Sequence, residues 1–374
     1  MKHLADWRLL LLLVLCAACA TTQLPPHTGA KLNLEEDEKE IWRQAAQGER
    51  QIDRSGMIVE SPEIDAYLED ITRKLFPDLL LDCRVRVVRD ASMNAFALPN
   101  GAIYIHMGLL ARMENEAQLA TLLGHETTHI ANRHAVKKRR ELKNMSAVYA
   151  AITLGGYGGG LFTMASITGY GRDQEREADV EAYRRMVAAG YEPLEAPKLF
   201  VIIDRWVAET GTKDPYFFSS HPNLQERIEN FQGLVAADPN KGKGMDHREV
   251  FLSMTKGIVL ENTELDLKAG RFESASQGVE KYLAVEPKDA RGYYVKGEIF
   301  RQRNTGNDID LAMGCYREAV ELNDSYPDPY RALGMIEFKR GQKTEARQYL
   351  EKYLTLNPGG PDRAYIEKYI RSLE

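Results

Sequence analysis

The sequence is poor in cysteine and has no excess of basic residues. Four cysteines among 374 residues are too few to build a disulfide scaffold. Lys and Arg number 49 against 55 Asp and Glu, so the net charge is -6 and no broad nucleic-acid-binding surface is expected. The content of 44% hydrophobic and 28% charged residues argues against a disordered or collagen-like chain. A folded globular protein without a nucleic-acid partner is therefore predicted.

Long apolar runs are also missing. Residues 9–15 form an unbroken apolar run, which is too short to cross a bilayer of about 30 Å but suits the core of a signal peptide. Ala17 and Ala18 before Cys19 resemble a bacterial lipobox. We predict a signal peptide at residues 1–18, lipidation of Cys19 and a tether at residues 19–34. The alternative is an ordinary signal peptide cut near Ala20, and either reading predicts export.

A second uncharged stretch covers residues 146–171. Seven of its 26 residues are glycine, and each glycine costs about 1 kcal/mol relative to alanine in a helix interior. A membrane-spanning helix is therefore disfavoured. We expect two short helices around a flexible hinge, which would form either a lid over the functional site or a surface that touches a membrane.

Three helices are expected in the first 140 residues. One begins near Leu34 with acidic residues in its first turn, and another follows Ser61 with apolar residues at helical spacing. The third is a long helix that Asn115 caps, with Gln118 three residues later as in a capping box. It is expected to extend to the basic residues 137–140, because positive charge is favourable at a helix C terminus.

Strands are expected between the second and third helices. Residues 85–88 are rich in valine and predict a short strand. Residues 96–98 and 102–107 flank Asn100-Gly101, and Asn-Gly is a strong hairpin signal. The N-terminal half of the chain is thus predicted to be mainly helical with a small sheet.

The C-terminal third contains an internal repeat. Ala275, Ala312 and Ala346 occupy equivalent positions that are 37 and 34 residues apart. Small residues at fixed packing points and a proline after the second helix resemble tetratricopeptide repeats. Residues 246–374 are therefore expected to form an all-α repeat domain whose concave surface binds peptides or proteins. The alternative is a helical cap that only stabilises the first domain.

A metal-binding pattern lies on the third predicted helix. His125, Glu126 and His129 form the sequence H-E-x-x-H. Histidines at positions i and i+4 lie on one face of a helix, so both imidazoles can reach one Zn²⁺ at about 2.0–2.1 Å. Glu126 stands beside them and can act as a general base on water. One zinc ion per chain is expected.

A catalytic zinc site needs a third protein ligand and one open position. Glu175 and Asp179 lie at positions i and i+4 of another predicted helix, so both can point inward. Glu175 would bind the metal, and Asp179 would accept a hydrogen bond from a ligand histidine. Glu177 would point away. The alternative is that this segment is simply a solvated acidic helix start.

The same residues carry a resemblance to the zinc metallopeptidases of peptidase family M48. The resemblance extends over about residues 35–235, and the predicted peptidase domain covers residues 35–240. Four motifs carry the resemblance in order, with His134 beyond the second: residues 94–101, 125–129, 175–179 and 221–222. It implies an α+β chain, with a mainly helical zincin-type (gluzincin) domain and a small β-sheet, followed by the repeats. It also implies that His125, His129 and Glu175 bind zinc, that Glu126 is the general base and that Asp179 orients a ligand. An extended substrate would pair with a strand formed by Asn94, Ala95, Phe96, Ala97 and Leu98.

Together with the export signal and the repeats, the resemblance implies a zinc endopeptidase of the bacterial cell envelope. It would be periplasmic and anchored to the outer membrane as a lipoprotein. Its substrates would be unfolded or misassembled envelope proteins, principally of the outer membrane, and the repeats would recruit substrate or the outer-membrane assembly machinery. The alternative is a periplasmic chaperone or assembly factor with gated or minor proteolytic activity.

His221 and Arg227 have open roles at this stage. His221 precedes a predicted helix, so it is either a helix-start residue or a ring that approaches the zinc. In the second case it would block the open position in a resting state or steady the transition state. Arg227 on the same helix would stabilise a developing oxyanion.

Overall fold

A three-stranded sheet forms the centre of the N-terminal half of the computed structural model, which describes residues 24–29, 31–144, 170–211, 221 and 223–373. The strand order is β1-β3-β2. Strand β3 (Ala102–His106) pairs parallel with β1 (Arg84–Val88) and antiparallel with β2 (Ala95–Ala97). The predicted hairpin is confirmed, and Gly101 in its turn has a φ of 93°, which favours glycine. Among the described residues, β2 is an edge strand.

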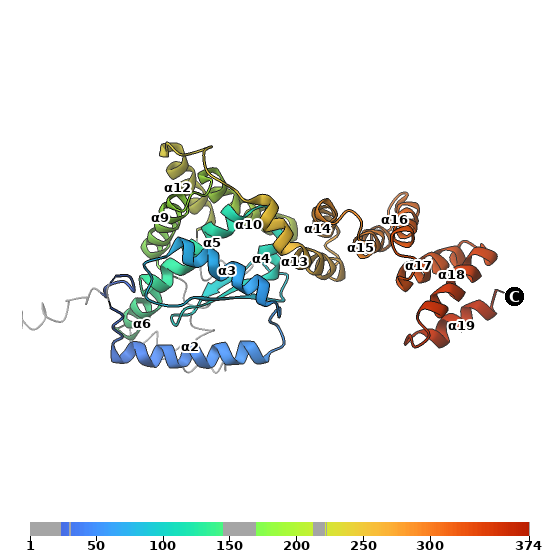
Figure 1. The fold of residues 1–374 in the computed structure, drawn as a ribbon, viewed down its shortest axis with the longest axis horizontal. Coiled ribbons are helices and arrows are strands. Elements are labelled where there is room, and N and C mark those ends of the chain that lie inside the picture. Colours follow the sequence, from blue (N-terminus) through green and yellow to red (C-terminus); the bar gives the residue numbers. More distant parts are fainter. Residues whose placement is uncertain (1–23, 30, 145–169, 212–220, 222, 374) are drawn as a thin grey trace, which may run out of the picture.

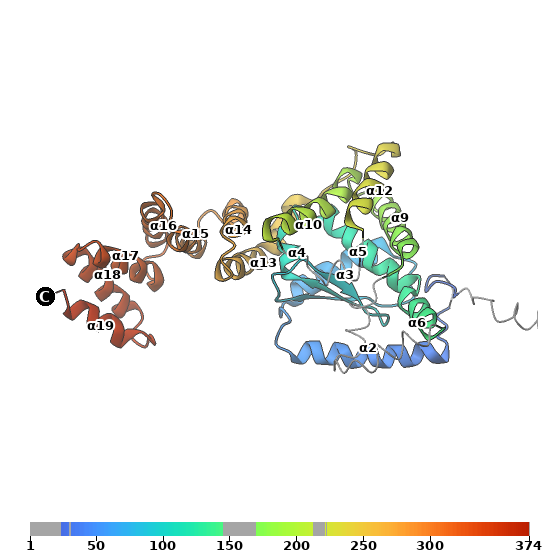
Figure 2. The same cartoon turned by 180° about the vertical axis from the view of Figure 1, so that it is seen from behind.

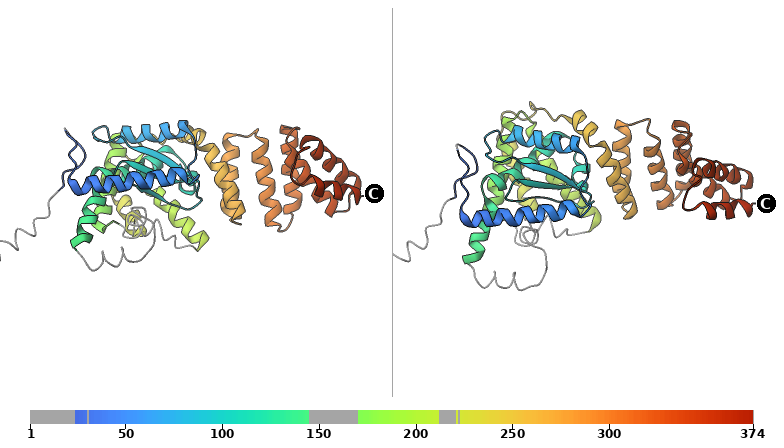
Figure 3. Two further views of the ribbon diagram at one scale, coloured as in Figure 1. Left: turned by 90° about the horizontal axis from the view of Figure 1, so that it is seen from below. Right: turned by 60° about the horizontal axis from the view of Figure 1, so that its bottom comes forward.

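Helices cover both faces of the sheet (Figures 1 and 3). On one face, Tyr104 of β3 packs in a small buried cluster with Ala45 of α2 (Glu36–Arg54). On the other face, Ile103 and Ile105 join the main buried cluster, which includes residues of α3 (Pro62–Leu75) and α5 (Glu116–Ala131). Successive side chains of β3 thus serve opposite layers, as the period of a strand requires.

The first two predicted helices are confirmed, but the third is wrong in length. Asn115 caps α5 by accepting a hydrogen bond from the Gln118 backbone N–H at 3.0 Å, yet α5 ends at Ala131. A separate helix, α6, spans His134–Asn144. Between them Arg133 adopts a left-handed φ of 57°, and its buried guanidinium forms an ion pair with Glu38 of α2. This ion pair favours the break between α5 and α6, which a continuous apolar pattern did not reveal.

The basic residues at 137–140 therefore belong to α6 and not to the end of α5. The guanidinium of Arg140 lies 2.6 Å from both Asp37 and Glu35, at the start of α2. Arg139 donates to Gln44 of α2 at 2.9 Å, so two of these basic residues tie α6 to α2 rather than complementing the C terminus of α5.

The remaining helices of the N-terminal half surround α5. They are α4 (Met107–Arg112), α9 (Arg172–Ala188), the short 3₁₀ helix η1 (Pro193–Glu195), α10 (Ala196–Thr210) and α12 (Leu224–Ala237). Helix α9 lies along α5 because Gly124 has no side chain: a Cβ at this position would lie only 3.1 Å from Ala182 of α9.

The C-terminal third is a row of helices that leads away from the N-terminal half (Figures 1 and 2). Its helices pack in consecutive pairs and end with α19, in the order α13 (Arg248–Lys268), α14 (Phe272–Val285), α15 (Ala290–Arg303), α16 (Asp308–Leu322), α17 (Pro327–Lys339), α18 (Lys343–Leu356) and α19 (Arg363–Arg371). Ala275, Ala312 and Ala346 are fully buried, which confirms them as packing points.

The repeat helices share packing with the N-terminal half. Phe251 and Ile258 of α13 belong to the same buried cluster as residues of α3 and α5. Arg112 of α4 forms an ion pair of 2.7 Å with Asp266, and Arg89 forms one with Glu261. The two halves of the chain are thus joined by a continuous core and by ion pairs.

Several sequence-based expectations fall on other parts of the chain. The predicted signal region, Cys19 and residues 146–169 of the glycine-rich stretch lie outside the described residues. Within the described ranges, no helix combines the length and apolar character that a membrane crossing requires. Cys83 and Cys315 are free thiols.

Candidate metal centre

Helix α5 carries two histidines and a glutamate into the interior of the protein. Every residue of this helix is buried, His125, Glu126 and His129 among them. The helix is held by its Asn115 cap at one end and by close packing against α9. Because i and i+4 positions share a face, the Nε2 atoms of His125 and His129 lie only 3.0 Å apart.

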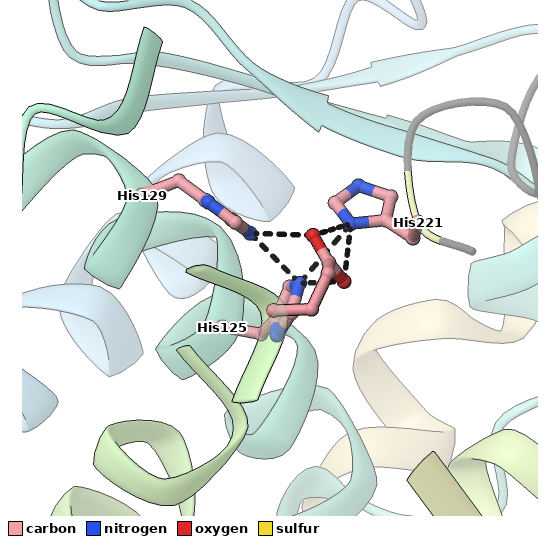
Figure 4. Close-up of side chains that lie close together, drawn as sticks. His125, His129 and His221 are labelled. Carbon is pink, nitrogen blue, oxygen red and sulfur yellow. Dashed lines mark hydrogen bonds and ion pairs between the residues drawn. The ribbon is translucent and has the colours of Figure 1, made fainter. Parts of the chain in front are cut away.

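Two further side chains complete a group of four. Metal-ligating atoms of His125, His129, Glu175 and His221 all lie within 4.8 Å of one another, and all four residues are buried. Glu175 Oε1 of α9 lies 3.4 Å from His129 Nε2 and 3.1 Å from His221 Nδ1. Figure 4 shows the three histidine rings converging on a common point from α5 and from the segment before α12.

The outer nitrogens of the two α5 histidines have partners within the protein. Asp179 Oδ1 lies 2.9 Å from His125 Nδ1, and His134 Nδ1 lies 2.8 Å from His129 Nδ1. Hydrogen bonds at these outer positions leave the inner Nε2 atoms to act as electron-pair donors. Two such nitrogens facing each other repel unless a cation lies between them. Three imidazoles and one carboxylate form a donor set that fits zinc.

Burial and neighbouring charge set the ionisation of the group. Burial alone would raise the pKa of Glu175, but positive charge on His221 and Arg227 holds that pKa well below its usual value. Burial also lowers the pKa of His129 well below its usual value. A carboxylate that stays ionised and an imidazole that stays neutral are the forms that metal binding requires. Burial lowers the pKa of His221, but the charges of Glu175 and Glu126 raise it overall, so His221 has to lose a proton before it can bind a metal.

Glu126 gives the strongest indication that this site binds a group that is not part of the protein chain. Both of its carboxylate oxygens are buried, and neither has a hydrogen-bond partner among the described residues. The nearest charged neighbour is His221, whose Nε2 lies 3.4 Å from Oε1. Burying a carboxylate without hydrogen bonds is costly, so the arrangement fits a metal and a water or substrate beside Glu126.

Arg227 of α12 lies behind the donor group. Its guanidinium contacts Asp179 at 2.6 Å and 3.0 Å, approaches Glu175 Oε2 at 3.3 Å and stacks over the Phe200 ring. It lies close to the site, and besides these two carboxylates it contacts the His125 ring, with Nη2 3.0 Å from Nδ1. The resulting network ties α12 to both α9 and α5.

The predicted substrate-binding strand and Glu177 are not among the four donor residues. Asn94 precedes edge strand β2, which contains Ala95, Phe96 and Ala97, and Leu98 follows it. The side chain of Glu177 is half exposed, and it contacts His134 at 3.3 Å instead of the four donors.

Tyr170 is a site residue that the sequence did not reveal. Its ring stacks on His129 with centroids 3.7 Å apart and an interplanar angle of 13°. The only available signal was an aromatic residue just before the start of α9. Stacking of this kind limits the rotation of the His129 ring and covers one side of it.

Known families match two parts of the chain. Residues 60–235 match peptidase family M48, and residues 305–361 match a tetratricopeptide repeat. The "Beta-barrel assembly-enhancing protease" of Escherichia coli (strain K12) is 21% identical over 360 residues, which cover 81% of this chain and 71% of that protein.

Two yeast proteins with mitochondrial names are also similar to this chain. The "Mitochondrial metalloendopeptidase OMA1" of Schizosaccharomyces pombe is 30% identical over 157 residues, covering 41% of this chain and 46% of that protein. Its Saccharomyces cerevisiae counterpart is 30% identical over 159 residues, covering 39% and 45%. This chain thus spans less than half of both yeast proteins, and 39% of a Vibrio cholerae relative. Among solved structures, the MamA protein gives a TM-score of 0.27 at 18% identity over 47% of this chain and 89% of that one, which is too low to establish a shared fold.

Proposed function

Because residues 60–235 form a peptidase family M48 domain, we propose that this protein is a zinc-dependent endopeptidase that cleaves unfolded or misassembled proteins of the bacterial cell envelope. The observation that carries the proposal is the buried convergence of His125, His129 and Glu175 next to the carboxylate of Glu126, which accepts no hydrogen bond from the described residues. Apart from the 3.4 Å contact with His221, neither oxygen of this buried carboxylate has a hydrogen-bond partner among the described residues.

The chain's own residues divide the work. His125, His129 and Glu175 would hold zinc, which when bound supplies the Lewis acidity that activates water and polarises a carbonyl. The free oxygens of Glu126 can take a proton from the attacking water and pass it to the leaving nitrogen. Asp179 fixes the orientation of His125 through the 2.9 Å contact at Nδ1.

The edge of strand β2 is a suitable place for an extended substrate to pair. Strand β2 pairs with β3 on one side only within the described chain, and it contacts α5, which carries the histidines. An extended peptide can add to such an edge through backbone hydrogen bonds. This mode selects unfolded segments rather than a narrow sequence motif, because folded chains do not present free backbone.

The selectivity for unfolded chains can be tested by comparing cleavage of one protein in its unfolded and its folded form. Reduced and carboxymethylated lysozyme should be cleaved at least about ten-fold faster than native lysozyme, since only the unfolded chain offers free backbone. The measurement is product formation by mass spectrometry, with a zinc chelator as the control. Equal rates on the two forms would contradict pairing with an edge strand, and chelator-resistant cleavage would contradict a metal-dependent reaction.

His221 gives the proposal a second element. With His125, His129 and Glu175 it makes a set of four donors, and four protein ligands leave no open position at a tetrahedral zinc. The described arrangement therefore supports a resting state in which His221 must leave before substrate can react. This feature also favours the alternative function, an assembly factor whose proteolysis is gated.

Replacing His221 should raise the rate if it closes the site. For an open state populated at about 10%, removing the closing group raises the rate about ten-fold. The measurement is kcat on unfolded casein for His221→Ala, together with zinc content. A strong fall in kcat with zinc retained would instead show that His221 stabilises the transition state.

An envelope location is part of the proposal. It is supported by the sequence pattern before Cys19 and by the printed name of the Escherichia coli relative, which concerns β-barrel assembly. We include lipidation of Cys19 and anchoring to the outer membrane. The repeats would recruit misassembled substrates or outer-membrane assembly proteins, since stacked repeats form extended binding surfaces.

A further inference from the structure

A cavity of about 270 Å³ lies where the peptidase domain meets the repeats, away from the four metal donors. Residues of α10 and α4 line one side, and residues of α13 and α14 line the other. Figure 2 shows these four helices gathered at the junction of the two halves. We call this the junction cavity. It is slightly smaller than the range of about 300–1,000 Å³ typical of sites for drug-sized ligands, so it suits one or two amino-acid residues.

Two buried polar groups in its wall lack partners. The indole N–H of Trp206 and the side-chain carbonyl oxygen of Asn262 have no hydrogen bond among the described residues. Trp206 is 6% exposed and Asn262 is 4% exposed. Buried polar groups are nearly always paired. Within the described part of the chain, the Trp206 N–H therefore lacks an acceptor, and the Asn262 oxygen lacks a donor. A peptide group supplies both, because its C=O accepts from an indole and its N–H donates to an amide oxygen.

The cavity is also lined by two cations, Lys281 and Arg205, that form no direct ion pair among the described residues. The Lys281 ammonium donates to the backbone carbonyls of Ala111 and Met113, which are uncharged, and one of its three hydrogens remains available. Burial lowers the pKa of Lys281 to about 8, as expected for a cation without an ion partner. Arg205 also lines the cavity and forms no ion pair among the described residues.

Three acidic residues line the wall, and none forms an ion pair with Lys281 or Arg205 among the described residues. Glu209 accepts a hydrogen bond from the Ser274 hydroxyl at 3.2 Å, and the other two are paired with other cations. Asp266 is already paired with Arg112 at 2.7 Å and with Arg271 at 2.7 Å. Glu114 is paired with Arg248 at 2.8 Å. Lys281 and Arg205 then stand against Glu209 alone, so an excess of positive charge remains and a carboxylate on the ligand would be favoured.

Apolar side chains complete the wall. Val201, Ile202 and Val259 line the cavity beside the ring of Trp206. A ligand that matches all these features has an apolar side chain, a peptide group and a carboxylate.

We propose that the junction cavity binds the C-terminal end of a polypeptide whose last residue is apolar. The terminal carboxylate lies at Lys281 and Arg205, the last peptide group pairs with Trp206 and Asn262, and the apolar side chain packs on the valine and isoleucine wall. Bound in this way, a substrate or partner chain is held between the peptidase domain and the repeats.

Binding can be measured without cleavage. The probe is a fluorescein-labelled peptide, Gly-Ser-Ala-Leu-Phe, with a free C-terminal carboxylate, and the protein is the full chain carrying Glu126→Gln. Fluorescence anisotropy reports affinity whether or not the protein is a protease, so failure of this inference is distinct from failure of the proposed function. Amidation of the C terminus should weaken binding about ten-fold, because a charge-assisted contact is lost.

Two variants test the wall directly. Trp206→Phe keeps a ring and removes the N–H, and we expect about five-fold weaker binding. Arg205→Gln removes an exposed cation that has no structural partner, and about ten-fold weaker binding is expected. Arg363→Gln on α19, far along the row of repeats, is the matched control and should leave affinity unchanged. Unfolding temperatures of all variants confirm that the fold is intact.

Several outcomes would overturn the proposal. They are equal affinity for the amidated peptide, no effect of either wall variant, or no binding of the free peptide at millimolar concentration. An amidated peptide with an internal glutamate tests the source of the carboxylate. Equally tight binding of that peptide would show recognition of an acidic side chain and would overturn recognition of a chain end.

Discussion

Glu126→Gln is expected to lower kcat/KM on an unfolded protein by about 10³-fold, while zinc content stays at about one ion per chain. The amide has nearly the same shape as the carboxylate but cannot take a proton from water. Both oxygens of Glu126 are buried without hydrogen bonds, so the substitution breaks no hydrogen bond among the described residues. Folding and zinc binding should therefore persist. Activity is measured with labelled casein, and zinc by elemental mass spectrometry.

A matched variant separates the loss of a catalytic group from the loss of one negative charge. Glu141 is an exposed glutamate on α6, and Glu141→Gln removes the same charge at a distance from the donors. It should retain the full rate. Cleavage by the Glu126→Gln protein at more than about a tenth of the original rate would remove Glu126 from the role of general base.

Glu175→Ala is expected to lower zinc affinity by more than about 100-fold and to remove activity with it. Loss of an outer partner of a ligand already costs about 10–100-fold in metal affinity, and Glu175 supplies a donor atom itself. Its removal also leaves the charge of Arg227, which lies 3.3 Å from Glu175 Oε2, less well compensated. Affinity is measured by competition with a chromogenic chelator.

The same helix provides the control. Glu177 lies two residues further along α9, and its half-exposed side chain contacts His134 and Asn132 rather than the four donors. Glu177→Ala should bind zinc within a few-fold of the original affinity. Comparable losses in the two variants would show that general acidity of α9, and not a ligand at Glu175, supports metal binding.

Local patterns in the sequence were sufficient for many features. Asn115 caps the helix that it was predicted to cap, a helix follows Ser61 as predicted, and the Asn100-Gly101 turn joins β2 to β3. These features depend on a few neighbouring residues, so a single sequence contains their causes. The break at Arg133 was missed because it depends on Glu38, which lies 95 residues earlier in the chain.

The sequence by itself determined which side chains share a helix face: His125 with His129, and Glu175 with Asp179. The i and i+4 spacing fixes these pairs whatever the rest of the chain does. Only the tertiary structure decided that the pairs meet. Their approach depends on Gly124 against Ala182, and Arg227 bridges Asp179 and Glu175. It likewise decided that His221 lies against Glu175, that Tyr170 stacks on His129 and that a cavity forms between α10 and α14. Each of these positions results from packing between distant segments, which no local spacing specifies.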